Sequence, residues 1–341
     1  MTPAVQPSLS GGPHSMRSTA IHIRRHGGPD VLEQVEVDVP EPAAGEVQLR
    51  QTAIGLNFAD IYQRKGAHGP HGGAPFPITL GSQGAGVVQA LGEGVTGLRV
   101  GQSVAYFQPG AYQTTRNVHA SRVLPLPDGV SEELAGANML RGLTAEYLLR
   151  RLYVVKPGDA ILVHAAAGGM GVILSQWARA LGAIVIGTVG SDEKAAVALA
   201  NGCHHVINYR SEDFVARTLD FTQGDGVAVV YDAVGKDVFV PSLQCLRTLG
   251  LAINYGTASG DVEGLDLHLL HARSLSICRP TLRSYIASPA DLQRGAEGLF
   301  EAMREGHVRL EVKHRYPLTD VQRAHRELEG RLTTGAPVLI P

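Results

Sequence analysis

The stretch HAAAGGMGVILSQWARALGA, residues 164–183, decides the fold class. Against the dinucleotide-binding pattern G-x-G-x-x-G, its three key positions are Ala166, Gly168 and Gly171. In that pattern the first glycine permits a tight turn, the second admits the pyrophosphate, and the third lets helix and strand pack closely. Alanine suits the first position when its φ is negative, because its side chain is only a Cβ. The stretch therefore predicts a phosphate-binding turn between a strand and a helix.

Strand-like and helical segments alternate around this turn. Helical segments are expected at 169–181, around 193–200, at 212–221 and at 238–249. Six strand-like segments separate or flank them, namely AILVHA, AIVIGTV, HHVINY, GVAVVYDAVG, GLAINYG and SLSIC. Regular alternation of this kind is typical of a doubly wound parallel sheet, so the expected class is α/β with a Rossmann fold.

The chain before this region has a different pattern. From residue 19 to about 140, short apolar or alternating segments are separated by Gly and Pro turns, which predicts a small irregular barrel. One helix, FADIYQRKG, is expected between Asn57 and Gly66. The final segment has no partner sheet of its own and is expected to return to the barrel. The predicted organisation is a tail at 1–16, a barrel domain at 17–141 and 283–341, and an inserted dinucleotide domain at 142–282.

Composition limits the classes of function. The chain has 341 residues, 44% apolar and 18% charged, as in an ordinary globular protein of two domains. A net charge of −2 argues against nucleic acid as a partner. The sequence contains no run of about 18 apolar residues, so it predicts no membrane-spanning helix. Three scattered cysteines favour a reducing cytoplasm. Residues 1–16 are read as a disordered tail, or as an extension upstream of a start at Met16.

The strand after the glycine turn indicates which nucleotide is bound. NAD sites usually place an acidic residue there to hold the ribose 2′-hydroxyl. Here the strand ends GTVGSDEKAA, with Thr188, Gly190 and Ser191 at its tip and Lys194 one helical turn beyond. Hydroxyls and a lysine suit a 2′-phosphate, which favours NADP. The alternative is that Asp192 is the NAD acid, slightly displaced.

Several motifs together resemble one family. HAAAGGMG, GTVGSDEKAAVAL, VINYRSEDF, VYDAVGKD and the C-terminal YPLTDVQRAHRELEGR with LIP are similar to the zinc-free quinone oxidoreductases. These form the zeta-crystallin-like branch of the medium-chain dehydrogenase/reductase superfamily. The resemblance implies a GroES-like catalytic barrel with an inserted Rossmann domain, NADPH as cofactor and quinone reduction. It also implies a homodimer, expected to pair near residues 274–278.

The resemblance also assigns residues to sites. The catalytic positions it implies are Asn57, Asp60 and Tyr62. Asn57 and Thr144 are also assigned to the cofactor cleft, and the pyrophosphate loop corresponds to Ala167, Gly168, Gly169, Met170 and Gly171. The 2′-phosphate is expected at Ser191, Lys194, Tyr209 and Arg331, and the remaining cofactor positions are Gly190, Tyr255 and Gly256.

The departures from zinc-using relatives limit the chemistry. Those relatives have a cysteine ligand where this chain has Asn57, and a G-H-E motif where it has Gly81-Ser82-Gln83. No metal is therefore expected. Without a Lewis acid the acceptor must already be electrophilic, as a quinone or conjugated enone is. Asn57 and Tyr62 are expected to donate hydrogen bonds to the acceptor oxygen, with Asp60 orienting them.

Other interpretations compete with each assignment. Asn57 and Asp60 can be a capping box, Tyr62 can pack on the barrel, and Thr144 can be a helix-start hydroxyl. His164 is expected to be a core histidine, and His68 and His71 to lie in a flexible loop. For the whole protein, the alternative activity is an NADPH-dependent enone or alkenal double-bond reductase. A third possibility is a non-catalytic, crystallin-like binder of NADPH or RNA.

Overall fold

The computed structural model describes residues 15–66, 75–330, 332–333 and 335–341, and the chain divides into two units. The first unit comprises the described residues up to Ala137, together with 315–332 and 337–341. The second comprises 138–314 and 333–336. The sequence placed the boundaries at 141/142 and 282/283, so residues 283–314 group differently from that expectation. Among the described residues, no helix is long and apolar enough to cross a membrane.

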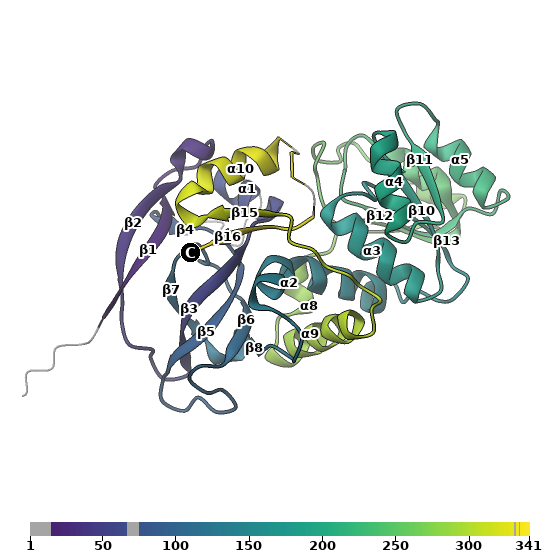
Figure 1. Ribbon diagram of the computed structural model, residues 1–341. Helices are drawn as coiled ribbons and strands as arrows, with labels where there is room; N and C mark the ends of the chain where they lie inside the picture. Colours follow the sequence, from purple (N-terminus) through teal and green to yellow (C-terminus); the bar gives the residue numbers. More distant parts are fainter. Residues whose placement is uncertain (1–14, 67–74, 331, 334) are drawn as a thin grey trace, which may run out of the picture. The chain divides into compact units, whose positions relative to one another are not determined.

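The first unit is built mainly from antiparallel strands (Figure 1). A three-stranded sheet has the order β2-β1-β4, and a larger sheet runs β15-β16-β3-β5-β6-β8, with β7 also pairing β3. The strands are β1 (Met16–Ile23), β2 (Glu33–Val39), β3 (Glu46–Gly55), β4 (Ile78–Thr79), β5 (Gln83–Leu91), β6 (Ser103–Phe107), β7 (Thr115–His119), β8 (Val123–Pro125), β15 (His314–Pro317) and β16 (Pro337–Ile340). Met16, expected in the tail, begins β1; residues 1–14 lie outside the described part.

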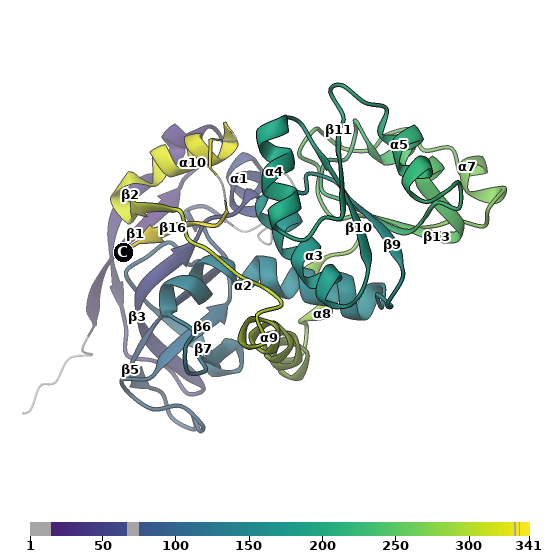
Figure 2. The same ribbon diagram turned by 45° about the vertical axis from the view of Figure 1, so that its right-hand side comes forward.

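Two helices of the first unit lie side by side in Figures 1 and 2. They are α1 (Phe58–Lys65) and α10 (Val321–Glu329). The sequence prediction for α1 is confirmed: Asn57 is its N-cap, and Gly66 ends it in the left-handed conformation with φ 82°. Glycine is favoured at such a C-cap because it has no Cβ to clash. The contact between α1 and α10 thus brings together two segments that are far apart in the sequence.

The second unit contains a parallel sheet of six strands in the order β11-β10-β9-β12-β13-β14. Numbered within the unit this is 3-2-1-4-5-6, the dinucleotide-binding order, so the predicted Rossmann sheet is confirmed. Its strands are β9 (Ala160–Val163), β10 (Ile184–Val189), β11 (His205–Asn208), β12 (Val227–Asp232), β13 (Leu246–Asn254) and β14 (Ser276–Cys278). Its helices include α3 (Gly169–Ala180), α4 (Asp192–Ala200), α5 (Phe214–Phe221), α6 (Phe239–Ser242), α7 (His268–His271), α8 (Leu282–Tyr285) and α9 (Pro289–Arg304).

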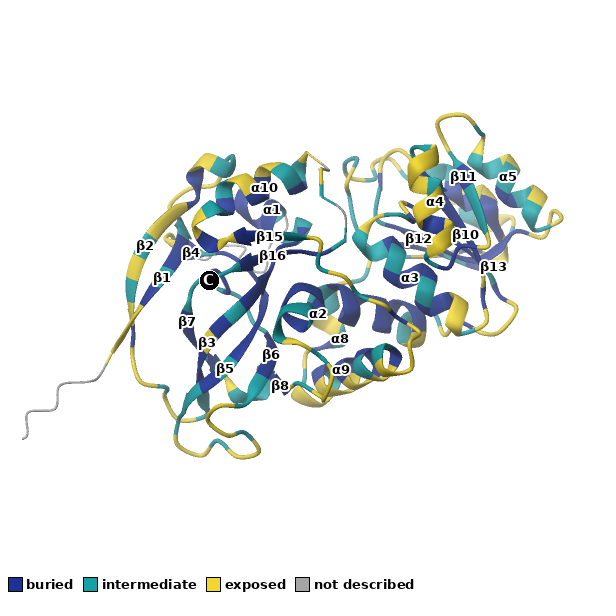
Figure 3. Cartoon of the chain, viewed as in Figure 1, coloured by how far each residue is buried: buried dark blue, intermediate teal, exposed yellow. Residues whose placement is uncertain are grey.

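Burial explains why these strands read as continuous apolar segments. Every residue of β12 is buried, and β9 and β10 are buried along most of their length (Figure 3). Parallel strands covered on both faces lose the alternation of half-buried ones. One predicted helix was wrong: the segment 238–249 is helical only to Cys245, because Leu246 already pairs with Val227 and begins β13.

The sequence analysis missed α2 (Glu132–Tyr147), a helix of 16 residues. From Ala135 onward nearly all of its residues are buried. A helix covered on all sides has no polar face, so its sequence carries no 3.6-residue period. Thr144 lies in the last turn of α2, so the helix-start interpretation of this residue was wrong.

The grouping of residues 283–314 follows from the packing of α9. Two glycines of α9 face the second half of α2. A Cβ added to Gly295 would lie 3.0 Å from the Leu143 side chain, and a Cβ added to Gly298 would lie 3.2 Å from the Glu146 side chain. On the α2 side, a Cβ on Gly142 would lie 2.2 Å from Leu299. This close helix packing places α9 in the second unit. The predicted strand RLEVKHRYP forms only from His314 to Pro317.

Candidate active site

The glycine turn forms as predicted between β9 and α3. Ala166 is buried and has no positive φ; the left-handed residue is its neighbour Ala165, with φ 52°. Gly168 is exposed, and a Cβ on it would approach one atom, the Ala165 oxygen, at 3.1 Å. A Cβ on Gly171 would lie 2.3 Å from that oxygen and 2.6 Å from the Ala166 Cα. The second glycine therefore leaves room above the turn, and the third permits the close approach of helix and strand.

A buried arginine stands beside this turn and was not predicted. Arg141 of α2 is 7% exposed, and its Nε would lie 3.3 Å from a Cβ on Gly169. The Gly335 carbonyl oxygen would lie 3.0 Å from the same point. A guanidinium at a helix N-terminus adds positive charge where free N–H groups already attract phosphate. Arg141 escaped the sequence analysis because α2 itself did. Ala167 and Met170, also assigned to this loop, are half-buried.

The tip of β10 presents the residues expected at the 2′-phosphate. Ser191 is the N-cap of α4 and accepts the Lys194 N–H at 3.4 Å. Lys194 is exposed and makes no ion pair with any residue that the structure describes. Tyr209 is 45% exposed, and its hydroxyl oxygen would lie 2.7 Å from a Cβ on Gly190. Ser191, Lys194 and Tyr209 are thus close together, with Gly190 between them. Arg331, the fourth residue predicted for the 2′-phosphate, lies outside the described residues, as do His68 and His71.

A second cation, Arg210, lies at the same place and was also missed. Its Nε would lie 3.7 Å from a Cβ on Gly190. The alternative NAD acid is engaged elsewhere, because the Asp192 Oδ1 accepts the Asn208 side-chain N–H at 2.9 Å. This tip therefore carries two exposed cations, while the Asp192 carboxylate already has a protein partner.

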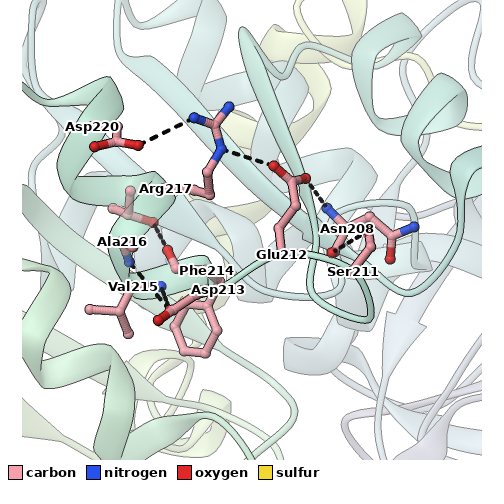
Figure 4. A network of polar contacts seen from close by, with 10 residues as sticks. Asn208, Ser211, Glu212, Asp213, Phe214, Val215, Ala216, Arg217 and Asp220 are labelled. Carbon is pink, nitrogen blue, oxygen red and sulfur yellow. Dashed lines mark hydrogen bonds and ion pairs between the residues drawn. The ribbon is translucent and has the colours of Figure 1, made fainter.

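The turn that carries Tyr209 and Arg210 is held by its own polar network (Figure 4). The Asn208 N–H donates to Glu212 Oε1 at 3.2 Å, and the Ser211 hydroxyl donates to the Asn208 carbonyl at 3.3 Å. Arg217 Nε donates to the other Glu212 oxygen at 2.9 Å. Glu212 thus links the turn to α5, which fixes the backbone at the residues facing Gly190.

His164 is a core histidine, as predicted. Its Nε2 lies 2.8 Å from the Ser242 hydroxyl and its Nδ1 lies 2.9 Å from the Thr188 hydroxyl. The Ser242 hydroxyl donates its proton to the Val238 carbonyl, so Nε2 must be the donor and Nδ1 the acceptor. Burial lowers the pKa of His164 to about 3. The Thr188 proton is consequently used inside the protein and is not available to a phosphate.

The carboxyl ends of β12 and β13 are joined by Asp232. Its carboxylate accepts the Val234 N–H at 2.7 Å, the Gly235 N–H at 3.0 Å and the Asn254 amide at 2.9 Å. Asn254 also donates to the Gly256 carbonyl at 2.9 Å. This arrangement fixes the loop after β13, where a ligand of a doubly wound sheet binds. Asp232 was not predicted as a member of the site.

Tyr255 is the other assigned residue of this loop. Its hydroxyl is buried and has no hydrogen-bond partner among the described residues. Burial raises the pKa of this phenol far above its usual range, so the group is neutral. A buried polar group without a protein partner is expected to bind a ligand or water.

The catalytic candidates belong to the first unit. Asn57 is 3% exposed, and neither its amide nitrogen nor its amide oxygen has a hydrogen-bond partner within the described part of the chain. Its backbone N–H donates to Asp60 Oδ2 at 2.7 Å, as in a capping box. The side-chain amide nitrogen of Asn57 takes no part in this cap and has no hydrogen-bond partner among the described residues. Tyr62 is half-buried, with its ring 6.3 Å from that of Phe58.

The segment that replaces the G-H-E motif of zinc-using relatives packs within the first unit. Gln83 is buried and donates to the Ala137 carbonyl at 3.0 Å. Gly81 has φ 86°, and a Cβ there would lie 2.4 Å from the Tyr112 ring. Within the described ranges, no three His, Cys, Asp or Glu side chains gather as a metal site requires.

Comparison with known proteins identifies the family. Residues 43–159 match the alcohol dehydrogenase GroES-like domain, and residues 169–299 match the family described as zinc-binding dehydrogenase. A quinone oxidoreductase of Salmonella typhimurium is 46% identical over 329 residues, which cover 95% of this chain and 100% of that protein. The chain belongs to the quinone oxidoreductase family. This confirms the resemblance seen in the sequence.

Solved structures of the quinone oxidoreductase family agree. The Escherichia coli quinone oxidoreductase complexed with NADPH matches with a TM-score of 0.90 and 44% identity, over 95% of this chain and 100% of that one. A 2-haloacrylate reductase of Burkholderia sp. is also similar, with 43% identity over 94% of this chain and 98% of that protein. The family therefore contains reductases of more than one kind of acceptor.

Proposed function

We propose that the protein is a zinc-independent NADPH:quinone oxidoreductase of the cytoplasm. The observation that carries the proposal is the side chain of Asn57. Its amide is buried without a protein partner, although leaving such a group unsatisfied costs about 1–3 kcal/mol. This arrangement is explained if the amide donates to the oxygen of a bound acceptor.

The second unit fits NADPH. The room above Gly168 and the close contact at Gly171 suit a pyrophosphate, with Arg141 beside it. Lys194, Tyr209 and Arg210 suit a 2′-phosphate, because a phosphate binds cations and hydroxyl donors together. When bound, NADPH supplies a hydride.

The protein's own residues then act on the acceptor. Asn57 donates an amide N–H and Tyr62 donates its hydroxyl to the acceptor oxygen, where negative charge develops during reduction. Asp60 accepts the Asn57 backbone N–H and so fixes the residue that donates. A quinone or conjugated enone delocalises this charge, so hydrogen-bond donors suffice in place of a Lewis acid.

NADPH oxidation with a panel of acceptors tests the proposal. We expect turnover with 1,4-benzoquinone and 9,10-phenanthrenequinone, and little with an unconjugated ketone. Tight NADPH binding without turnover of any acceptor would instead support the non-catalytic binder. The similarity to a 2-haloacrylate reductase favours a conjugated carboxylic acid or enone as the second class of acceptor, so 2-chloroacrylate and a simple enone belong in the same panel.

Cofactor selectivity is expected to depend on Lys194. The Lys194→Ala substitution should weaken NADPH binding roughly 10- to 100-fold, since a charge-assisted bond contributes about 1.5–3 kcal/mol, while NADH binding stays within about twofold. Fluorescence titration of both nucleotides measures this. The matched control is Lys156→Ala, which removes an exposed lysine that precedes β9, at the amino ends of the parallel strands and so at the end opposite the tip of β10. Equal losses for NADPH and NADH would contradict the 2′-phosphate assignment.

The Tyr62 hydroxyl is expected to act on the acceptor alone. Tyr62→Phe keeps the ring beside Phe58 and removes a hydroxyl for which the described residues provide no bond. We expect kcat to fall about tenfold with an unchanged melting temperature, because no internal contact is lost. Steady-state kinetics and calorimetry measure both quantities. A variant with wild-type kcat would assign Tyr62 to packing.

A homodimer through the second unit is part of the proposal. The strand β14 is an edge strand of the parallel sheet, and its residue Ile277 is exposed. Leu249, Leu267 and Leu269 nearby in the chain are also exposed. An edge strand with exposed apolar side chains is suited to pairing with another copy.

A further inference from the structure

Three buried side chains form a chain of hydrogen bonds, and the last of them, Tyr112, interacts with the carboxylate of Asp60. Arg64 Nη1 lies 3.1 Å from His325 Nδ1, and His325 Nε2 lies 3.1 Å from the Tyr112 hydroxyl. Tyr112 also interacts with the Asp60 carboxylate, which, after burial, is the main cause that raises the pKa of this phenol. All four residues are 0% exposed and belong to the first unit. The chain connects α1 and α10 to the segment before β7.

The direction of this chain follows from the chemistry of its first member. A guanidinium only donates, so His325 Nδ1 must accept from Arg64. The single proton of the neutral imidazole is then on Nε2, which donates to the Tyr112 oxygen. The Tyr112 hydroxyl therefore accepts from His325, and its own proton remains available for the Asp60 carboxylate with which it interacts. Burial, with Arg64 next in effect, lowers the pKa of His325 to about 3, so the ring stays neutral and this direction persists at ordinary pH.

The Arg64 end of the chain is firmly anchored. Arg64 Nε donates to the Gly27 carbonyl at 3.0 Å, and Nη2 donates to Glu329 Oε2 at 2.6 Å. Glu329 also pairs with Lys65. The buried positive charge is thus balanced and its donors are used, which is the condition under which a buried ion pair is tolerated.

At the other end lies the candidate catalytic amide. Asp60 accepts the Asn57 N–H at 2.7 Å, and the Asn57 side-chain nitrogen has no hydrogen-bond partner among the described residues. We infer that Arg64, His325 and Tyr112 are positioning residues that orient Asp60 and, through it, hold the Asn57 amide toward the acceptor. This inference rests on the proposed function for the role of Asn57. It assigns a function to a buried polar network, which rigidifies the groups it joins when its members are satisfied.

The packing around Tyr112 supports a fixed geometry. A Cβ on Gly81 would lie 2.4 Å from one ring carbon of Tyr112 and 2.7 Å from the next. Gly81 has φ 86°, which other residues rarely adopt. The glycine therefore lets the ring lie against the backbone, where its hydroxyl reaches both His325 and Asp60.

Removal of one hydroxyl tests the chain. Tyr112→Phe is expected to lower kcat for 1,4-benzoquinone roughly 10- to 100-fold, since small misplacements of catalytic groups are costly, with the Kd for NADPH unchanged within about twofold. Tyr106→Phe is the matched control. Tyr106 is also 0% exposed, and its hydroxyl bonds Gln51 and Arg116 instead. Both variants lose a buried hydroxyl, so both lose stability, and only Tyr112→Phe should lose kcat.

A second pair of variants separates polarity from packing. Glutamine at position 325 offers one acceptor and one donor, as His325 does, whereas leucine offers neither. We expect His325→Gln to retain at least about fivefold more kcat than His325→Leu. A residue needed only to fill space would give the opposite order, because leucine is the better core residue.

Hydrogen exchange of the Asn57 backbone amide gives a readout without turnover. Asp60 protects this amide, so Tyr112→Phe should speed its exchange about tenfold, and Tyr106→Phe should not. Unchanged exchange and unchanged kcat in Tyr112→Phe overturn the inference, as does an equal loss of kcat in Tyr106→Phe. If the wild-type protein reduces no acceptor while the exchange result holds, the proposed function fails and the positioning of Asp60 and Asn57 stands.

Discussion

Gly171→Ala is expected to reduce kcat/KM for NADPH about 100-fold and to lower the free energy of unfolding by about 1–3 kcal/mol. The new Cβ would lie 2.3 Å from the Ala165 oxygen and 2.6 Å from the Ala166 Cα. Both atoms are backbone, so no side-chain rotation relieves the clash. The turn must move away from α3, which displaces the N–H groups that receive the pyrophosphate. NADPH titration and denaturant unfolding measure the two effects.

Gly168→Ala is the comparison that separates these effects. Its Cβ would approach only the Ala165 oxygen, at 3.1 Å, and its φ is −78°. We expect the free energy of unfolding of this variant to stay within about 0.5 kcal/mol of wild type, because the backbone φ suits alanine and the new Cβ makes a single tight contact. Affinity for NADPH should fall, because the side chain enters the room above the turn. Wild-type stability and affinity in Gly171→Ala would refute the assignment of the third glycine.

Acid is expected to destabilise both units through one buried histidine in each. The pKa is lowered to about 3 by burial in His164, and by burial together with Arg64 in His325. In the unfolded chain each titrates near 6.5. Between these values the unfolded state binds a proton that the folded state does not, so stability falls as the pH falls. At pH 5 each histidine lowers the free energy of unfolding by about 2 kcal/mol relative to pH 8.

Comparison with variants isolates this effect. Buried carboxyls act in the opposite sense, because burial raises the pKa of Glu146 and of Asp232 despite their favourable partners. The measured quantity is therefore the slope of unfolding free energy between pH 5 and 8, in wild type against His164→Gln and His325→Gln. Each variant should flatten the slope for its own unit. Slopes identical to wild type would mean that these histidines are protonated in the folded state.

The sequence was sufficient for the Rossmann half of the fold. The glycine turn and the six apolar segments around it predict β9 to β14, and the structure has them in the dinucleotide-binding order. It was insufficient for α2, whose residues are buried on nearly every side and so carry no helical period. The sequence pattern also predicted a helix through Leu246–Leu249, where the pairing of β13 with β12 overrides the local helical preference.

The site was predictable where local motifs carry it. Asn57 and Asp60 were recognised both as a cap and as catalytic candidates, and the structure shows that the backbone takes the first role while the Asn57 side-chain nitrogen is left without a partner among the described residues. Arg141, Arg210 and Asp232 were missed because only the tertiary fold brings them to the turn, to the tip of β10 and to the loop after β13. No spacing in the chain relates Arg64 to His325, which are 261 residues apart.

That separation has a consequence for synthesis of the protein. Arg64 leaves the ribosome early, but its partners His325 and Glu329 emerge only after the whole segment 138–314 of the second unit. Until then the nascent first unit contains a guanidinium without the imidazole and the carboxylate that it meets in the finished core. Because domains generally fold as units during translation, the Rossmann unit can be complete while α1 is still waiting for α10. The contacts of the candidate catalytic helix with α10 therefore form late, because the chain makes segment 138–314 before it makes the partners of Arg64.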